Sequence, residues 1–352
     1  MSRFLSESAS SLTPYTPGEQ PQDKGCIKLN TNECPYAPSL LVLQAVERFQ
    51  AGELRLYPDP TASRLRDAAA EAYGLPADYI FAGGGSDEIL AFAFMAFFEK
   101  GDPVLFPDVT YGFYKVYADL FGLSSIQIPL AEDFSVNLSD YTSAQGHFFL
   151  ANPNAPTGIP LSPGQIEEFL RENPGRLLIL DEAYVDFDPG CSCVQLTKRY
   201  DNLLVVQTFS KSRALAGMRI GFAFGNPELI AALERIKYSF NPYNIDRVTI
   251  EVGIAALKDT DYTKNIAARI IRTRQETAAA LAGLGFESLP SGANFLFSRI
   301  KGKDGGWLYQ SLKDKGILVR HFGAPRISDF IRISVGSEKE MKALVGTLEE
   351  IL

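Results

Sequence analysis

Short apolar runs alternate with helical patterns between residues 79 and 225, and this alternation limits the possible folds more than any other feature. The runs have the length of strands. They are Tyr79–Ala82, Pro103–Phe106, Ser125–Leu130, His147–Ala151, Arg176–Leu180, Leu203–Gln207 and Ile220–Phe224. Helical patterns occur at Asp87–Phe98, Tyr111–Phe121, Pro163–Glu172 and Pro227–Tyr238. This order predicts an α/β fold in which helices cover both faces of a mostly parallel sheet.

The pattern changes after residue 244. Two long helices are predicted at about 245–258 and 262–283, followed by an α+β unit. A chain of 352 residues is also long for a single core. We expect an arm and a segment packed on the small domain at 1–45, a large domain at 46–240, and a small domain at 241–352.

Composition and charge exclude several classes of protein. The formal net charge of −8 argues against nonspecific binding to nucleic acid. The longest apolar run, residues 89–98, is too short to span a bilayer, and the N-terminus lacks the apolar core of a signal peptide. Four cysteines in a chain of this length do not form a disulfide framework, and their spacing does not predict a zinc site. We expect a cytoplasmic protein without a metal.

Polar motifs follow the predicted strands. Ligands of an open parallel sheet bind at the carboxyl ends of its strands, so these motifs are candidates for one shared site. They are GGGSDE from residue 83, PDVTYG from 107, NPNAPTG from 152, DEAY from 181 and TFSK from 208. A structural protein has no reason to gather these groups in one crevice.

Lys211 follows the apolar run Leu203–Gln207 and stands between two serines. Taken alone, a lysine at a strand end is most often a surface residue with a partly buried stem. A lysine in a partly desolvated site has a lowered pKa and can form a Schiff base with an aldehyde. Pyridoxal phosphate is the cofactor that supplies such an aldehyde to many enzymes.

The remaining groups suit that cofactor. A helix start, small hydroxyls and an arginine bind phosphate, and GGGSDE, Thr208, Ser210 and Arg219 offer them. Asp181 can face the ring nitrogen and keep it protonated, although an acid at a strand end is often only a helix cap. Tyr184 could donate to the ring phenolate and Tyr111 could stack on the ring, but each tyrosine alone is more often core packing.

The joint pattern resembles the fold-type I aminotransferases of the aspartate aminotransferase superfamily. It consists of SKSRALAGMRIG from residue 210, DEAY 30 residues upstream of Lys211, then NPNAPTG and GGGSDE earlier. The order and spacing extend over most of the chain. Within the superfamily, the chain is most similar to the histidinol-phosphate aminotransferase family. This likeness rests on LTPYTPG, KLNTNECPYAPS, LYPDP, SGANF and GILVRHFG.

The resemblance implies a role for each candidate residue. Lys211 would carry the cofactor, Asp181 and Tyr184 would hold the ring nitrogen and the phenolate oxygen, and Tyr111 would stack on the ring. The residues implied at the phosphate are Ser86, Asp87, Thr208, Ser210 and Arg219, with Tyr57 reaching the phosphate of a partner subunit. Arg332 would bind the substrate α-carboxylate. Apart from the resemblance, Arg320 and Tyr15 are candidates for the substrate phosphate, although an arginine such as Arg320 is nearly as often part of a surface ion pair. Asn32 and Asn294 are further candidate substrate contacts. The implied assembly is a homodimer with shared active sites.

One position departs from the superfamily pattern. The asparagine that binds the phenolate oxygen precedes PTG in relatives, and here that position is Ala155. Asn154 or Asn152 could replace it from a shifted backbone, or Tyr184 could act alone. Gly84 also stands where relatives often have asparagine.

The implied reaction is transamination of histidinol phosphate with 2-oxoglutarate in histidine biosynthesis. The partners of the enzyme would be a small amino donor and a 2-oxo acid acceptor. Three alternatives share the cofactor residues and remain open at this point. They are an aromatic or broad-specificity aminotransferase, a threonine-phosphate decarboxylase and a non-enzymatic regulator. The regulator would normally carry a DNA-binding segment, for which the acidic chain has no candidate.

Overall fold

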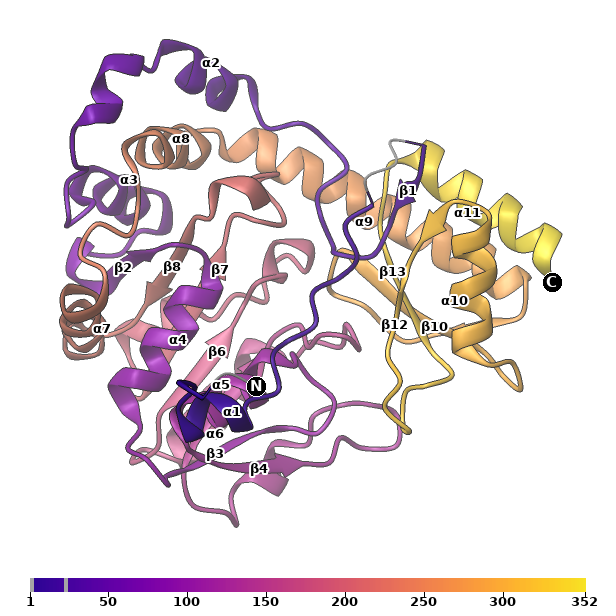
Figure 1. Cartoon of the computed structure of the whole chain (residues 1–352), viewed down its shortest axis with the longest axis horizontal. Coiled ribbons are helices and arrows are strands. Elements are labelled where there is room, and N and C mark those ends of the chain that lie inside the picture. The colour runs from indigo at the N-terminus through magenta and orange to yellow at the C-terminus, as the bar shows by residue number, and fades with distance from the viewer. Residues whose placement is uncertain (1–2, 22–24) are drawn as a thin grey trace.

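A seven-stranded sheet forms the centre of the larger part of the molecule (Figure 1). The computed structural model describes residues 3–21 and 25–352. The spatial order of the strands is β2-β8-β7-β6-β5-β3-β4. Their bounds are β2 (Ile80–Gly83), β3 (Pro103–Pro107), β4 (Ser124–Ile128), β5 (His147–Ala151), β6 (Leu178–Asp181), β7 (Leu203–Thr208) and β8 (Gly221–Phe224). The strands of this sheet run in one direction except β8, which is antiparallel to both β2 and β7, so the predicted mostly parallel α/β fold is confirmed.

Helices cover both faces of this sheet. On one face lie α4 (Ser86–Phe97), α5 (Phe113–Phe121) and α7 (Pro227–Phe240), and their apolar side chains join one core. On the other face lie α3 (Ser63–Tyr73), α6 (Pro163–Glu172) and α8 (Arg247–Lys258), which share a second core.

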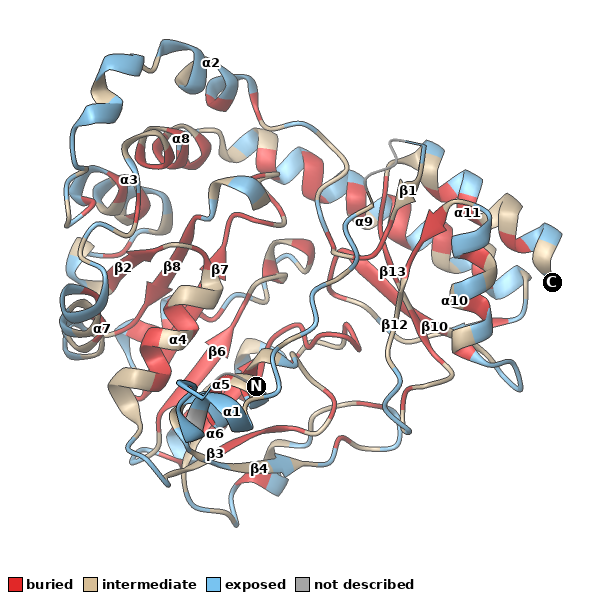
Figure 2. Ribbon diagram, viewed as in Figure 1, coloured by how far each residue is buried: buried red, intermediate tan, exposed pale blue. Residues whose placement is uncertain are grey.

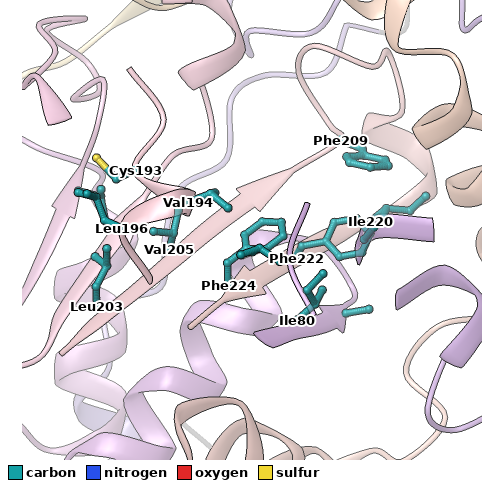
Figure 3. Close-up of a cluster of buried hydrophobic side chains, with 14 of the residues drawn as sticks. Ile80, Cys193, Val194, Leu196, Leu203, Val205, Phe209, Ile220, Phe222 and Phe224 are labelled. Atoms are coloured by element: carbon teal, nitrogen blue, oxygen red, sulfur yellow. The ribbon is translucent and has the colours of Figure 1, made fainter. Parts of the chain in front are cut away.

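Successive strand residues supply the two cores in turn, because side chains of a strand alternate between faces. Phe148 belongs to one core and Phe149 to the other. Figure 3 shows part of the second core, where Phe222 and Phe224 of β8 lie near Ile80 of β2. A sheet buried on both faces explains why its strands appear in the sequence as continuous apolar runs.

Local signals set the helix starts. Ser162 and Gln165 form a capping box at α6, and Asn226 caps α7 by accepting from the N–H of Leu229. A proline occupies the first turn of each of these two helices, where no N–H is needed. These signals are local, so the predicted and observed starts agree.

The smaller part of the molecule is built on a four-stranded antiparallel sheet in the order β12-β13-β10-β9. Its strands are β9 (Phe286–Ser288), β10 (Phe295–Ile300), β12 (Arg320–His321) and β13 (Ile331–Ser334). Its helices are α9 (Thr260–Gly283), α10 (Gly305–Asp314) and α11 (Glu338–Ile351), which lie together in Figure 1. The N-terminal segment joins this unit, because β1 (Ile27–Lys28) pairs in parallel with β11 (Ile317–Leu318).

The position of α8 bears on the domain division. Its side chains Ile250, Val252 and Leu257 belong to the core of the large unit, next to α3. The predicted boundary near residue 240 would separate α8 from these neighbours. We therefore propose that α8 folds with the large domain and that the small domain begins with α9.

The remaining helices of the described chain are short. They are α1 (Glu7–Ser11), α2 (Leu40–Arg48) and 3-10 helices at Ala51–Arg55, Ala77–Tyr79, Leu138–Tyr141, Val185–Phe187, Val194–Lys198 and Ala216–Met218. Figure 2 shows that much of α2 is exposed, whereas the central strands are buried. Within residues 3–21 and 25–352, no helix has the length and apolar character needed to cross a membrane.

Candidate active site

A cavity of about 540 Å³ opens at the carboxyl ends of the parallel strands. Its wall combines residues that follow β2, β3, β6 and β7 with residues of the small domain and the N-terminal arm. Most of the predicted site residues lie in this wall. They are Tyr15, Asn32, Ser86, Asp87, Tyr111, Asp181, Tyr184, Thr208, Ser210, Lys211, Arg219, Arg320 and Arg332.

Lys211 enters this cavity from the turn that follows β7. Its amine donates to the backbone carbonyl of Thr31 at 3.1 Å and lies 5.8 Å from the centre of the Tyr184 ring. No carboxylate forms an ion pair with this amine among the described residues. The amine can therefore exchange one carbonyl contact for a bond to an aldehyde.

Two glycines let Arg219 reach the other end of the cavity. Gly85 has φ +87°, in the left-handed region, and a Cβ there would lie 2.6 Å from the Arg219 guanidinium. A Cβ on Gly221 would lie 2.6 Å from the backbone of Gly85. Since only glycine fits at either position, the close approach of these two turns brings Arg219 over the start of α4.

The groups near Arg219 are suited to a phosphate. Arg219 donates to the Ser210 hydroxyl at 3.3 Å, and the Thr208 hydroxyl donates to Ser210 at 2.9 Å. The first N–H groups of α4, at Ser86 and Asp87, have no partner within a helix and carry the positive end of its dipole. A guanidinium, two hydroxyls and a helix N-terminus are the donor set that an anionic phosphate needs.

The carboxylate of Asp87 has a different task from its N–H. It accepts from Arg219 at 3.0 Å and from the Tyr111 hydroxyl at 3.0 Å. Both contacts fix side chains that line the cavity. Asp87 therefore orients Arg219 and Tyr111.

Asp181 lies at the buried end of the cavity and is 5% exposed. One carboxylate oxygen accepts from the Tyr114 hydroxyl at 3.0 Å, and the other accepts from the N–H of Ala183 at 3.1 Å. Burial raises the pKa of Asp181 to about 6, although these two hydrogen bonds act to lower it. A cationic ring nitrogen would compensate this buried charge.

Tyr184 and Asn32 are linked in the cavity wall. The Asn32 side chain donates to the Tyr184 hydroxyl at 3.0 Å, and Ser334 donates to the side-chain oxygen of Asn32 at 2.8 Å. The Tyr184 hydroxyl still has its own proton to donate. It can therefore donate to an oxygen on a bound ring.

The asparagines of NPNAPTG point away from the cavity. Asn154 donates to the carbonyl of Val109 and to the Thr157 hydroxyl, and its oxygen accepts from Thr110. Asn152 exchanges two hydrogen bonds with the backbone of Leu161, and neither asparagine lines the cavity. The structure does not bring Asn154 to the predicted phenolate position, because the loop already uses its polar atoms.

Arg332 and Arg320 supply positive charge at the mouth of the cavity. Arg332 donates to the carbonyl of Asn30 at 2.8 Å, and its buried Nε has no partner in the described part of the chain. Arg320 donates to the carbonyls of Thr16 and Pro17, at 3.0 and 3.3 Å. Neither arginine has a carboxylate partner among the described residues, so both remain available to an anion.

Two further predicted residues lie outside the cavity wall. Tyr57 is 78% exposed and stacks on Tyr243, with ring centres 4.6 Å apart. Asn294 is buried behind the wall, where it donates to the carbonyl of Asn32 at 2.9 Å. Asn294 therefore supports Asn32 and does not face a ligand in this chain.

The sequence interpretation missed Tyr114, whose hydroxyl contacts Asp181. The only signal was its position three residues after Tyr111 in a helical pattern, which places both on one face. That spacing is equally typical of core packing.

Comparisons with known proteins agree with this geometry. Residues 24–348 match the family described as aminotransferase class I and II. The chain is 51% identical over 352 residues to histidinol-phosphate aminotransferase of Brachyspira hyodysenteriae, covering 100% of this chain and 99% of that protein. It is 47% identical to the enzyme of that name from Acinetobacter baumannii, covering 99% and 97% of the two chains.

Among solved structures, the chain resembles histidinol-phosphate aminotransferase from Sinorhizobium meliloti in complex with pyridoxal-5'-phosphate. The TM-score is 0.90 at 27% identity, covering 100% of this chain and 99% of that chain. Thermus thermophilus aspartate aminotransferase, at 20% identity and a TM-score of 0.85, shares the fold.

Proposed function

Because this chain belongs to the class I and II aminotransferases, we propose that it transfers the amino group of histidinol phosphate to 2-oxoglutarate, using pyridoxal phosphate. This is a step of histidine biosynthesis. The observation that carries the proposal is one cavity that joins Lys211, Asp181 and Arg219. In addition, the chain is about half identical, over its full length, to proteins named histidinol-phosphate aminotransferase.

The polar groups of the cavity fit the cofactor. Pyridoxal phosphate, when bound, supplies an aldehyde for the amino group and a protonated ring that accepts electrons. Lys211 would hold the aldehyde carbon through its amine, and the same amine would move the proton of the substrate carbon that bears the nitrogen. Asp181 would keep the ring nitrogen protonated, and Tyr184 would donate to the ring oxygen.

The phosphate end anchors the cofactor without entering the reaction. Thr208, Ser210 and Arg219, which are linked through the Ser210 hydroxyl, would donate there, together with the first N–H groups of α4. Tyr111 would lie against the open face of the ring, and its hydroxyl bond to Asp87 fixes its orientation. Asn154 plays no part in this proposal, so Tyr184 alone serves the ring oxygen in place of the asparagine missing at Ala155.

Two arginines let one cavity accept both substrates. Glutamate and 2-oxoglutarate present carboxylates, whereas histidinol phosphate presents a phosphate and no α-carboxylate. Arg332, which lines the cavity, binds the α-carboxylate through its guanidinium. Arg320 and Tyr15 bind the substrate phosphate, supported by their position at the mouth and by the fork geometry of a guanidinium.

We also propose a homodimer in which Tyr57 completes the phosphate site of the partner. Tyr57 is exposed and cannot serve its own cavity, and Leu40, Leu54 and Phe240 expose apolar side chains as well. Large exposed apolar groups of this kind mark contact surfaces. Cys34, Cys191 and Cys193 are free thiols in the described chain, which supports a reducing compartment such as the cytoplasm.

A product assay tests the proposed reaction. The purified protein should convert histidinol phosphate and 2-oxoglutarate into glutamate and the matching ketone, without release of CO2. Borohydride reduction should bleach the visible band of the bound cofactor and leave it attached to Lys211 in a peptide map. Release of CO2 from threonine phosphate would identify a decarboxylase, and wild-type turnover by Lys211→Ala would refute the role of that lysine.

A further inference from the structure

Tyr114 lies on α5 with its side chain fully buried between the helix and the sheet. Its ring packs against Phe149 and Tyr111, with ring centres 5.5 and 5.7 Å away. A phenol in such surroundings needs one polar partner, because an unpaired hydroxyl in an apolar core is costly. Its hydroxyl donates to the carboxylate of Asp181 at 3.0 Å.

The contact fixes the rotation of the Asp181 carboxylate. Tyr114 binds one oxygen and the Ala183 N–H binds the other, from two different segments of the chain. With both oxygens held, the carboxylate has one orientation toward the cavity. The other titratable groups that act on Asp181 are Asp87, which raises its pKa, and Lys211, which lowers it.

We propose that Tyr114 is a positioning residue for the reaction, whose hydroxyl orients Asp181 toward the ring nitrogen and stabilises its carboxylate form. The inference rests on the proposed role of Asp181. Tyr114 touches neither substrate nor cofactor, because it does not line the cavity. It acts through Asp181 alone.

A tyrosine suits this task because it remains a neutral donor. Burial and the neighbouring Asp181 raise the pKa of the Tyr114 hydroxyl well above its usual range. The hydroxyl therefore keeps its proton at every pH at which the enzyme works. A charged donor would compete with the cationic ring for Asp181, whereas a neutral hydroxyl leaves the full negative charge available.

The first test uses the protein without cofactor. The infrared band of the protonated Asp181 carboxyl, identified by its loss in Asp181→Asn, is followed against pH. Tyr114→Phe removes a hydrogen bond to a charged group, so the midpoint should rise by about one to two pH units. A wild-type midpoint in Tyr114→Phe would overturn the inference.

Tyr117→Phe is the matched control. Tyr117 lies one turn further along α5, is also buried, and donates to the backbone carbonyl of Asp87 at 2.8 Å. This change removes one buried hydroxyl that does not contact Asp181, so the midpoint of the Asp181 titration should stay at its wild-type value. If Tyr114→Phe does not fold, 3-fluorotyrosine at position 114 keeps the shape and strengthens the donor, and the midpoint should then fall.

The second test separates this inference from the proposed function. In the loaded enzyme, Tyr114→Phe should slow the half-reaction by roughly ten- to a hundredfold while the cofactor Kd changes little. Asp181→Asn at the wild-type rate would refute the role of Asp181 and the proposal built on it. If Asp181→Asn is slow but Tyr114→Phe has the same half-reaction rate as Tyr117→Phe, the role of Tyr114 would be refuted and that of Asp181 would stand.

Discussion

Asp181 shows how one residue can trade stability for chemistry. It follows a strand, is almost fully buried, and has only neutral hydrogen-bond donors in direct contact. An acid placed for stability would be exposed or paired with a cation. The burial therefore indicates a position prepared for a positively charged ligand.

The burial of Asp181 predicts that the stability of the protein without cofactor depends on pH. Burial raises the pKa of Asp181 to about 6 from an ordinary value of 3.8. The folded state thus favours the protonated acid, and this stabilisation is full below about pH 4 and disappears as the pH rises through about 6. The free energy of unfolding, measured with urea, should be compared between Asp181→Asn and wild type at pH 4 and at pH 7. The value for the variant minus that for wild type should increase by on the order of 3 kcal/mol from pH 4 to pH 7. A difference that does not change with pH would contradict this prediction.

Arg320 makes the substrate prediction at the same scale. Its guanidinium is held by two backbone carbonyls of the arm and has no carboxylate partner in the described chain. Arg320→Leu should raise the KM for histidinol phosphate at least tenfold, since it removes a charged hydrogen bond. The half-reaction with phenylalanine should change little. Arg320→Lys, which keeps the charge without the fork, should lie between the two, and an unchanged KM in Arg320→Leu would exclude this residue from the site.

At the scale of elements, the loop between β12 and β13 closes one wall of the cavity over the large domain. Its Arg326 donates to Asp108, which follows β3, and to the carbonyls of Leu130 and Ala131 beyond β4. Beside it, apolar side chains from both units form one cluster. They are Val109, Leu130 and Phe134 from the large unit, and Phe297, Ile327 and Phe330 from the small one.

Loss of the Arg326 contacts should loosen this wall. Arg326→Met keeps most of the apolar stem and removes three hydrogen bonds that cross between the units. The KM for the amino donor should rise roughly fivefold to tenfold, with kcat and cofactor retention nearly unchanged, because partly exposed contacts contribute modestly. Arg299→Met is the control, since Arg299 pairs with Glu287 and Asp329 inside the small unit. An equal effect of both changes would show that the loss is one of general stability.

Elements were predictable from the sequence to the extent that their signals are local. The apolar run at 147–151 became β5 without change, and the predicted helix at 163–172 became α6 with its own capping box. The antiparallel direction of β8 was not predictable, because an apolar run carries no mark of its direction. Lys211 was identified as a candidate because it follows the apolar run Leu203–Gln207.

Side-chain directions in loops were the weaker part of the prediction. Asn154 was a candidate for the phenolate oxygen because it lies close to PTG in the sequence, but the loop turns its amide toward Val109 and Thr157. Tyr114 was overlooked because a buried tyrosine in a helix has the same pattern whether it packs or donates. Both depend on contacts more than 40 residues apart, which no local pattern contains.

At the scale of the whole molecule, the cavity of one chain lacks the tyrosine that we expect from a partner subunit. Tyr57 is exposed beside Tyr243, outside the wall of its own cavity. Arg247 holds the segment by donating to the carbonyl of Tyr57 at 3.2 Å and to Glu53 at 2.8 Å. An ordered aromatic residue on an exposed segment is well placed to act on another subunit.

Hybrid dimers test this arrangement. When Tyr57→Phe subunits are mixed with Lys211→Ala subunits, a shared site puts both changes in one cavity and leaves the other cavity unaltered. In the hybrid dimers, half of the sites should then bind cofactor with wild-type affinity and turn over normally. If Tyr57 acted within its own chain, no hybrid site would be unaltered. A fully active monomer in sedimentation would exclude the shared site altogether.

The central claim concerns the amino donor, and the half-reaction of the wild-type protein tests it most directly. The loaded enzyme is mixed separately with histidinol phosphate and with phenylalanine, and the loss of the visible cofactor band is followed at several concentrations. Because we propose that Arg320 and Tyr15 bind a phosphate that phenylalanine lacks, kcat/KM should be at least tenfold higher for histidinol phosphate. A higher kcat/KM for phenylalanine would contradict the account and assign the enzyme to aromatic substrates.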